Sequence, residues 1–211
     1  MHLLLTDRLS CPRCGPEFGL ILLADRLEDR RVLHGTLGCP NCRDAFPVRD
    51  GFGDLRAPPR REMPEGLAGM PGGEGEADTD ADKVIALLGV TQGPGTLALV
   101  GAPSRHARAL ADRVDDVHVL AIDPDQKMWP ESNGVSRLMA TPGLPVYSLS
   151  LRGIAIDGRL GSELLAEAAR VVVPKGRVVV VHAGAETAKA LESHGLEVLA
   201  TEAGTVVAAR S

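Results

Sequence analysis

Residues 164–181 read LLAEAARVVVPKGRVVVV, and this stretch predicts the fold of most of the chain. Its first half places Leu and Ala at helical spacing, and its second half is a run of Val that is typical of a buried strand. Pro174 and Gly176 lie between the halves, where proline ends a helix and glycine lets the backbone reverse. The stretch therefore predicts a helix that turns directly into a core strand.

The same alternation extends on both sides of this stretch. Helices are expected at 83–88, 104–114, 161–170 and 185–194, and strands at 96–100, 117–122, 135–139, 152–156 and 177–182. Residues 197–201 and 205–209 are expected to form a closing strand pair. Alternating strands and helices predict an α/β fold with a doubly wound, mainly parallel sheet. The final hairpin predicts an antiparallel strand at or near one edge.

Three regions differ in composition. Residues 1–56 contain both cysteine pairs, many turns and short apolar runs, and are expected to form a small separate unit. Residues 57–82 are rich in Pro, Gly and acidic residues, with no basic residue after position 61. Such a segment has little to bury and is expected to be a flexible linker. Residues 83–211 are expected to form the α/β domain.

Composition excludes several function classes. The net charge is −5 and only 2% of residues are aromatic, which argues against strong binding of nucleic acid by this chain alone. No apolar run reaches the roughly 18–20 residues of a membrane span, and the start lacks the pattern of a secretory signal. All four cysteines lie in CxxC pairs, as metal ligands of a reducing compartment do. The expected location is cytoplasmic.

The cysteine pairs are Cys11-Pro-Arg-Cys14 and Cys39-Pro-Asn-Cys42, with 24 residues between them. Two CxxC turns supply four thiolates for a tetrahedral site without an open position, which favours a structural zinc ion. A redox CxxC would need a thioredoxin-like βαβ context, which is absent, and would leave the second pair unexplained. Iron in a four-cysteine site is the other alternative.

Residues 37–52 read LGCPNCRDAFPVRDGF, in which Asp50-Gly51 is a preferred two-residue hairpin turn. Together with the leading LLL and the first CPxC, this pattern resembles a family of short zinc ribbons. Its members include the small subunit that activates tRNA, rRNA and release-factor methyltransferases. The resemblance implies that the ribbon presents apolar and strand-edge groups near residues 46–52, either to its own α/β domain or to a protein partner.

The stretch at 164–181 also resembles class I methyltransferases, in which a similar turn leads into the fifth strand. That resemblance implies an S-adenosylmethionine site, with Gly101 in the loop after the first strand and Asp123 and Asp157 after later strands. The rest of the loop departs from the family, because Leu99 replaces an acid and Pro103 and Arg105 replace two glycines.

Each of the two acids also has a simpler interpretation that involves no cofactor. Asp123 would then serve to end a strand, and Asp157 would be a turn residue. No catalytic residue is predicted.

Three functions compete on this evidence. The favoured one is a zinc-binding protein with a non-catalytic, methyltransferase-like domain that acts as a partner or scaffold in modification of the translation machinery. The second is an active S-adenosylmethionine-dependent methyltransferase with an atypical loop. The third is binding of another small ligand at the same sheet edge.

Overall fold

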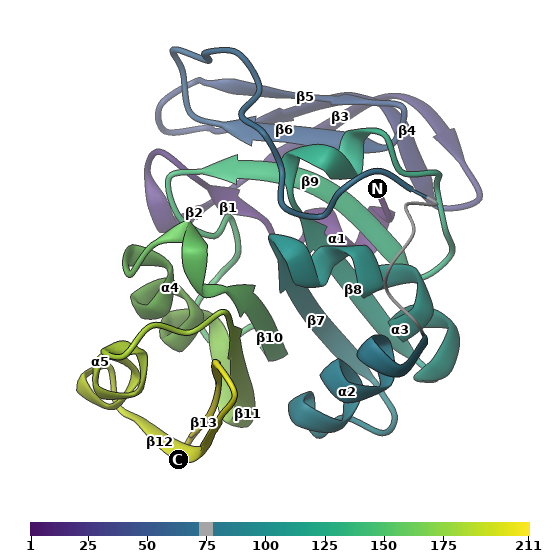
Figure 1. Cartoon of the computed structure of the whole chain (residues 1–211). Coiled ribbons are helices and arrows are strands. Elements are labelled where there is room, and N and C mark those ends of the chain that lie inside the picture. Colours follow the sequence, from purple (N-terminus) through teal and green to yellow (C-terminus); the bar gives the residue numbers. More distant parts are fainter. Residues whose placement is uncertain (72–77) are drawn as a thin grey trace.

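The computed structural model describes residues 1–71 and 78–211, and the side chains of all of these except Asp78 and Thr79. Within this part of the chain, eleven strands form one continuous sheet in the order β12-β13-β11-β10-β7-β8-β9-β6-β5-β4-β3. A separate pair, β1 and β2, lies beside it (Figure 1). The cysteine-rich region, residues 1–56, and the α/β region, residues 83–211, therefore share one sheet.

The cysteine-rich region supplies one short helix and the first six strands. Their bounds are α1 Leu3–Thr6, β1 Ser10–Cys11, β2 Gly15–Gly19, β3 Ile21–Glu28, β4 Arg31–Gly38, β5 Ala45–Arg49 and β6 Phe52–Arg56. Strands β5 and β6 form an antiparallel hairpin whose turn residues Asp50 and Gly51 have φ values of 49° and 70°. This is the left-handed backbone that the Asp-Gly pair favours, so the predicted hairpin is confirmed.

The α/β region supplies the other strands and most helices. Its α-helices are α2 Asp78–Leu88, α3 Ala107–Arg113, α4 Glu163–Val171 and α5 Thr187–Ser193, with 3₁₀ segments η1 Ala102–His106, η2 Pro124–Lys127 and η3 Gly158–Leu160. Its strands are β7 Gly95–Val100, β8 Val117–Ile122, β9 Val135–Thr141, β10 Leu151–Asp157, β11 Val172–Val181, β12 Leu196–Glu202 and β13 Thr205–Arg210. Each predicted strand has a counterpart.

The sheet is mixed rather than mainly parallel. Five central strands, β11, β10, β7, β8 and β9, pair parallel with one another, whereas β13 is antiparallel to both β11 and β12. The ribbon strands β3 to β6 pair antiparallel with each other. The predicted mainly parallel, doubly wound sheet is therefore not confirmed for the sheet as a whole, because the ribbon adds its own hairpins to it.

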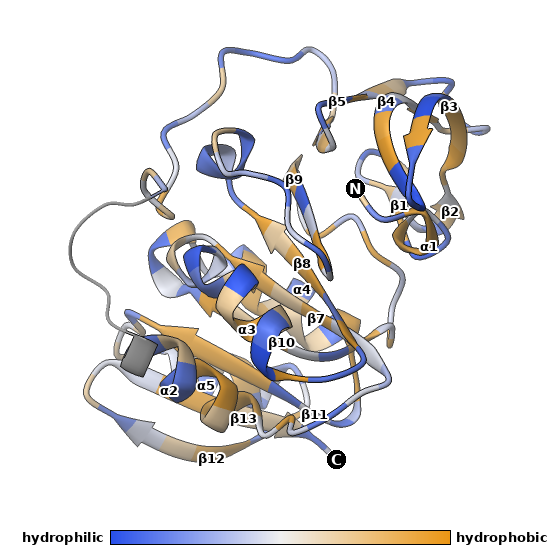
Figure 2. Cartoon of the chain, turned by 90° about the vertical axis from the view of Figure 1, so that its right-hand side faces the viewer, coloured by the Kyte–Doolittle hydropathy of each residue, from blue (hydrophilic) through white to orange (hydrophobic). Residues whose placement is uncertain are grey.

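Apolar side chains are buried on both faces of the central strands. Figure 2 shows that these strands consist largely of hydrophobic residues. One buried cluster joins α2 and α3 to one face and includes Leu88, Leu110 and Val119. The other joins α4 and α5 to the opposite face and continues into the ribbon. Because Leu37 and Phe46 share this second cluster with Leu138, the ribbon and the α/β region have one core rather than two.

The two regions meet where β6 pairs parallel with β9. Phe52 lies opposite Arg137 and Leu55 opposite Ala140 in this pair. A second contact runs beside it, where the Ser10 amide donates to the Pro145 carbonyl at 2.9 Å. The ribbon thus adds its strand to the edge of the chain's own α/β sheet.

Two element boundaries differ from the sequence expectation. Helix α2 begins at Asp78 and not at residue 83, although residues 72–77 before it lie outside the described part of the chain. Strand β11 begins at Val172 and not at 177, because the Pro174–Gly176 turn is an irregularity within the strand. Lys175 in this turn has a φ of 65°, so the chain bulges rather than ending one element and starting another.

No described helix has the length and apolar character to cross a membrane.

Candidate functional site

The four cysteines lie together at one end of the ribbon. Their sulfur atoms all lie within 4.8 Å of one another, and none is in a disulfide. The Sγ atoms of Cys11 and Cys42 are 3.7 Å apart, and those of Cys14 and Cys39 are 3.8 Å apart. A tetrahedral ion with Zn–S bonds of about 2.3 Å places its sulfurs about 3.8 Å apart. The donor set therefore fits a zinc ion.

Backbone turns hold the sulfurs in this arrangement. The Cys14 amide points to the Cys11 sulfur at 3.4 Å, and the Asn41 side chain donates to the Cys14 sulfur at 3.3 Å. The Arg43 amide donates to the Cys39 carbonyl at 3.0 Å and closes the second turn. With four protein ligands the coordination shell is complete, which is the arrangement of a structural site.

The three residues assigned to a cofactor lie at the carboxyl ends of neighbouring strands, β7, β8 and β10. Gly101 follows β7 with a φ of 73°, and a side chain there would meet Asp157 Cβ at 2.9 Å. The structure thus packs Gly101 against Asp157 and places Asp123 one strand away. Their binding of a cofactor stays a prediction.

Asp123 is 2% exposed, and residues 64–69 of the chain, which we call the strap, cover it. Its carboxylate accepts the Leu67 amide at 2.9 Å and the Asp125 amide at 2.9 Å. A Cβ atom at Gly66 would lie 2.2 Å from Asp123 Oδ1, so any side chain there requires the strap or this carboxylate to shift. Burial raises the pKa of Asp123, and these backbone donors partly offset that effect.

Further contacts hold the strap in place. The Gly69 amide donates to Asp125 Oδ2 at 2.8 Å, and the Trp129 indole donates to the Gly69 carbonyl at 2.9 Å. Arg105 donates to the Leu67 carbonyl at 3.0 Å. Arg105, in the loop after β7, therefore binds the strap, and the carboxylate of Asp123 accepts backbone N–H groups.

Asp157 is also occupied by neighbours from its own chain. Arg159 donates to both of its oxygens, at 2.9 and 2.7 Å, and His182 Nδ1 lies 3.3 Å away. Burial alone would raise the pKa of Asp157, but the Arg159 hydrogen bonds outweigh it and hold this pKa below its ordinary value. Asp157 is thus an ionised, internally paired carboxylate.

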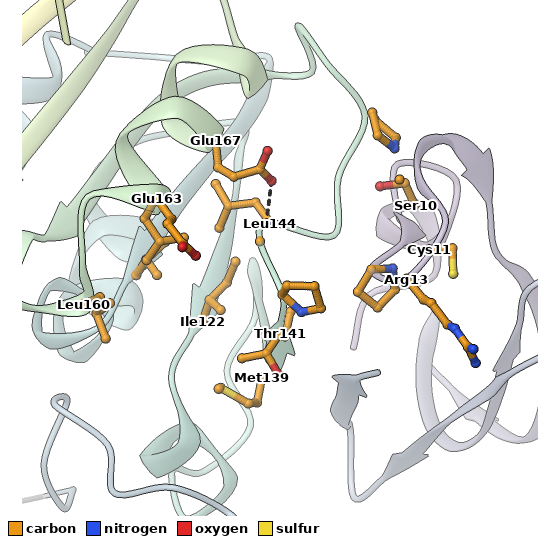
Figure 3. Close-up of a pocket in the computed structure, with 18 of the residues that line it drawn as sticks. Ser10, Cys11, Arg13, Ile122, Met139, Thr141, Leu144, Leu160, Glu163 and Glu167 are labelled. Atoms are coloured by element: carbon orange, nitrogen blue, oxygen red, sulfur yellow. Dashed lines mark hydrogen bonds between the residues drawn. The ribbon is translucent and has the colours of Figure 1, made fainter. Parts of the chain in front are cut away.

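A cavity of about 750 Å³ opens between the ribbon and the α/β region (Figure 3). Residues 10–16 of the first cysteine turn form one wall, and helix α4 forms the opposite wall. The ends of β7, β8 and β9 form the floor, and Pro64 and Glu65 of the strap lie at its side.

Sequence reasoning missed the strap and the cavity. The strap lies in a segment whose Pro, Gly and acid content is that of a linker, so nothing in its composition indicated ordered contacts. The cavity needs the ribbon to dock on its own domain, and the sequence left open whether the ribbon would bind there or to a partner.

Polar side chains also lie where the ribbon contacts the α/β region, at His2, His118 and Ser136, and we call this contact the seam. The Ser136 hydroxyl accepts the His2 amide at 2.8 Å and lies 2.8 Å from His118 Nε2. Burial, together with nearby positive charges such as His2, the amino terminus and Arg8, lowers the pKa of His118 to about 4. A neutral His118 therefore belongs to the docked state.

Acid should weaken this seam. An unfolded chain protonates His118 near its ordinary pKa of about 6.5, whereas the folded chain resists protonation down to about 4. Stability is therefore full above about pH 6.5 and falls as the pH drops toward 4, by on the order of 2–3 kcal/mol. Urea unfolding at several pH values measures this loss.

His118→Gln should reduce the acid slope, and His194→Gln, at an exposed position directly after α5, is the control. Equal slopes in the wild type and His118→Gln would show that this histidine does not govern the loss.

The fold and the cysteine cluster together define a four-cysteine ribbon joined to an α/β sheet. The family "Trm112p-like protein" matches residues 2–51, so the predicted activator-type ribbon is confirmed for this part of the chain. A search of curated proteins found no match.

Solved structures resemble the α/β fold. A geranyl diphosphate methyltransferase, in complex with GPP and sinefungin, is 13% identical with a TM-score of 0.52, over 63% of this chain and 77% of that one. A complex between the Haloferax volcanii Trm112 methyltransferase activator and a putative methyltransferase is 16% identical with a TM-score of 0.49, over 61% of this chain and 88% of that one. A TehB-like SAM-dependent methyltransferase from Corynebacterium glutamicum is 13% identical with a TM-score of 0.46, over 63% and 87%.

Proposed function

We propose that this chain combines an activator-type zinc ribbon with a methyltransferase-like domain that does not transfer methyl groups, and that it acts as a partner or scaffold for another protein. The pairing of β6 with β9 carries the proposal. A ribbon of this type offers a strand edge to a methyltransferase domain, and here that edge is bound by the domain of the same chain. The ribbon, residues 1–56, thus stabilises residues 83–211 in cis.

The metal in this proposal is a structural zinc ion held by Cys11, Cys14, Cys39 and Cys42. The support is the sulfur spacing of 3.7–3.8 Å and the completeness of the four-cysteine shell. The ion would fix both cysteine turns, of which the first lines the cavity, and it would supply no reactive position.

The non-catalytic part of the proposal rests on the occupied acids. Asp123 binds the strap and Asp157 binds Arg159, so neither carboxylate offers its oxygens to a cofactor without first losing contacts. Pro103 is buried within η1, and Arg105 is turned to the strap, where the family has close-approach glycines. These residues do not fit S-adenosylmethionine in the usual way.

The proposal predicts weak cofactor binding. Losing a charge-assisted hydrogen bond costs about 1.5–3 kcal/mol, and displacing the strap adds to this cost. A micromolar site would fall to roughly millimolar, since about 1.4 kcal/mol is a tenfold change. Calorimetric titration of the full-length protein with S-adenosylmethionine measures it. A Kd below about 10 μM that is lost in Asp123→Ala would sink the non-catalytic proposal.

An active methyltransferase is the second candidate, and the cavity favours it. The cavity lies at the carboxyl ends of parallel strands, where such folds bind ligands, and Asp123 lines it. Gly66→Val separates the two candidates, because any side chain there collides with Asp123 and should release the strap. Tight cofactor binding by this variant alone would indicate an enzyme restrained by its strap. Weak binding by both forms supports the non-catalytic proposal.

The partner in this proposal is a protein, in keeping with the activator-type ribbon, and a component of translation-related modification fits the resemblance. Crosslinking of the full chain in cell extract, followed by repetition with purified candidates, tests it. Wild-type protein that remains uncrosslinked to any purified component of that machinery would contradict this role.

A further inference from the structure

The cavity between the ribbon and helix α4 has the character of a small-molecule site. Its volume of about 750 Å³ falls within the range of about 300–1,000 Å³ that is usual for ligand pockets. Three separate segments enclose it: the first cysteine turn, the strap, and the strand ends with α4. A molecule bound there would contact the ribbon and the α/β region at once.

The inner lining is mainly apolar. Ile122 and Met139 face the cavity from the floor, and Leu144 and Leu160 do so beside α4 (Figure 3). Leu164 of α4 lines it as well. Pro12, Pro16, Pro64 and Pro142 add rigid apolar surface around them. Contact with such a lining favours an apolar ligand body, since burial gains about 25 cal/mol for each Å² of apolar surface.

Charge at the rim is unevenly compensated. The two arginines that line the cavity are already paired: Arg13 with Asp44 at 3.0 Å, and Arg170 with Glu167 at 2.8 Å. Glu167 also accepts the Leu144 amide at 2.8 Å. Glu65 and Glu163 line the cavity too, are exposed, and have no ion-pair partner among residues 1–71 and 78–211. The uncompensated charge at the rim is therefore negative.

We propose that this cavity binds a largely apolar small molecule that carries a positively charged amine. The alkyl or ring body lies against the leucines, Ile122 and Met139, and the amine lies at the rim beside Glu163 and Glu65. An anionic amphiphile with the same apolar body should bind more weakly, because both rim carboxylates repel its head group. Binding of such a ligand is independent of whether the domain transfers methyl groups.

The test uses full-length, zinc-loaded protein and two ligands with the same chain and opposite charge. The neutral dye N-phenyl-1-naphthylamine reports occupancy by fluorescence, and dodecylamine and dodecanoate compete with it below their micellar concentrations. Dodecylamine should displace the dye at a concentration about tenfold or more below that of dodecanoate. Equal or better displacement by dodecanoate would overturn the charge assignment.

Two variants locate the site. Thr141→Trp fills the cavity from an exposed position at the end of β9 and should weaken dye binding at least tenfold, whereas Thr201→Trp, on the exposed edge strand β12, should not. Glu163→Lys should weaken dodecylamine binding by about five- to tenfold, and Glu192→Lys on α5 is its control. Unchanged dye binding by Thr141→Trp would place the ligand elsewhere and refute the proposal.

The same titrations separate this inference from the proposed function. Displacement of the dye by S-adenosylmethionine at micromolar concentration would overturn the non-catalytic function, whereas the comparison of dodecylamine with dodecanoate would still decide the apolar-cation proposal.

Discussion

Cys39→Ser is expected to leave the protein without zinc and with an unfolded ribbon. Structural zinc contributes on the order of 10 kcal/mol in small modules, and residues 1–56 have too small a core to fold without it. The structure extends the effect beyond the ribbon. Because Leu37 and Phe46 belong to the same buried cluster as Leu138, loss of the ribbon exposes apolar surface on the α/β domain and leaves β9 as a bare sheet edge.

Zinc content by mass spectrometry and amide hydrogen exchange measure this result. In Cys39→Ser we expect loss of protection in β4, β5 and β6, and faster exchange in β9. Arg43→Ser, at an exposed position beside Cys42 that supplies no metal ligand, should keep zinc and protection. A zinc-free Cys39→Ser protein that stays protected in β4–β6 would show that the ribbon needs no metal.

Arg137→Met should cost the protein about 3–5 kcal/mol of unfolding free energy. Arg137 is 6% exposed and donates to the Gln126 carbonyl at 3.1 Å, to the Trp129 carbonyl, and to the Asp50 carbonyl at 2.7 Å. It therefore links the ribbon's hairpin turn to η2. Methionine fills much of the same volume but removes all three of these hydrogen bonds, one buried and two part-buried. A buried or part-buried acceptor that loses its donor costs about 1–3 kcal/mol, though such costs are not additive.

Urea unfolding followed by circular dichroism gives the free energy. Arg108→Met is the matched control, because Arg108 is exposed on α3 and pairs with Asp112 at 3.7 Å, a contact worth less than about 1 kcal/mol. If Arg137→Met and Arg108→Met differ by less than about 1 kcal/mol, Arg137 does not hold the ribbon turn to the domain.

The sequence predicted the features that depend on local spacing. The CxxC pairs indicated a four-cysteine cluster, Asp50-Gly51 indicated a hairpin, and the alternation of apolar runs indicated the strands of the α/β region. These patterns act over a few residues, where periodicity and turn chemistry determine the backbone.

The features that depend on contacts between distant segments were missed. Nothing around Leu67 indicated that its amide would bind Asp123, 56 residues away. Arg137 lies in a strand that was predicted, yet its role depends on where the ribbon turn comes to lie. The sheet was expected to be mainly parallel because the sequence left open whether the ribbon would join this chain's own sheet. The ribbon joins it through a parallel pair, β6 with β9, but brings the antiparallel pairs among β3 to β6 into the same sheet.

Joining of the ribbon and its domain in a single chain has a consequence for how the pair assembles. Two separate proteins associate according to their concentrations, whereas covalently joined modules meet at an effective concentration in the millimolar range. The β6–β9 contact can therefore be weak by the standards of a separate complex and still be fully formed at any level of expression. The ribbon is always present in a one-to-one ratio with its domain, so other proteins do not compete with that domain for the edge of β6.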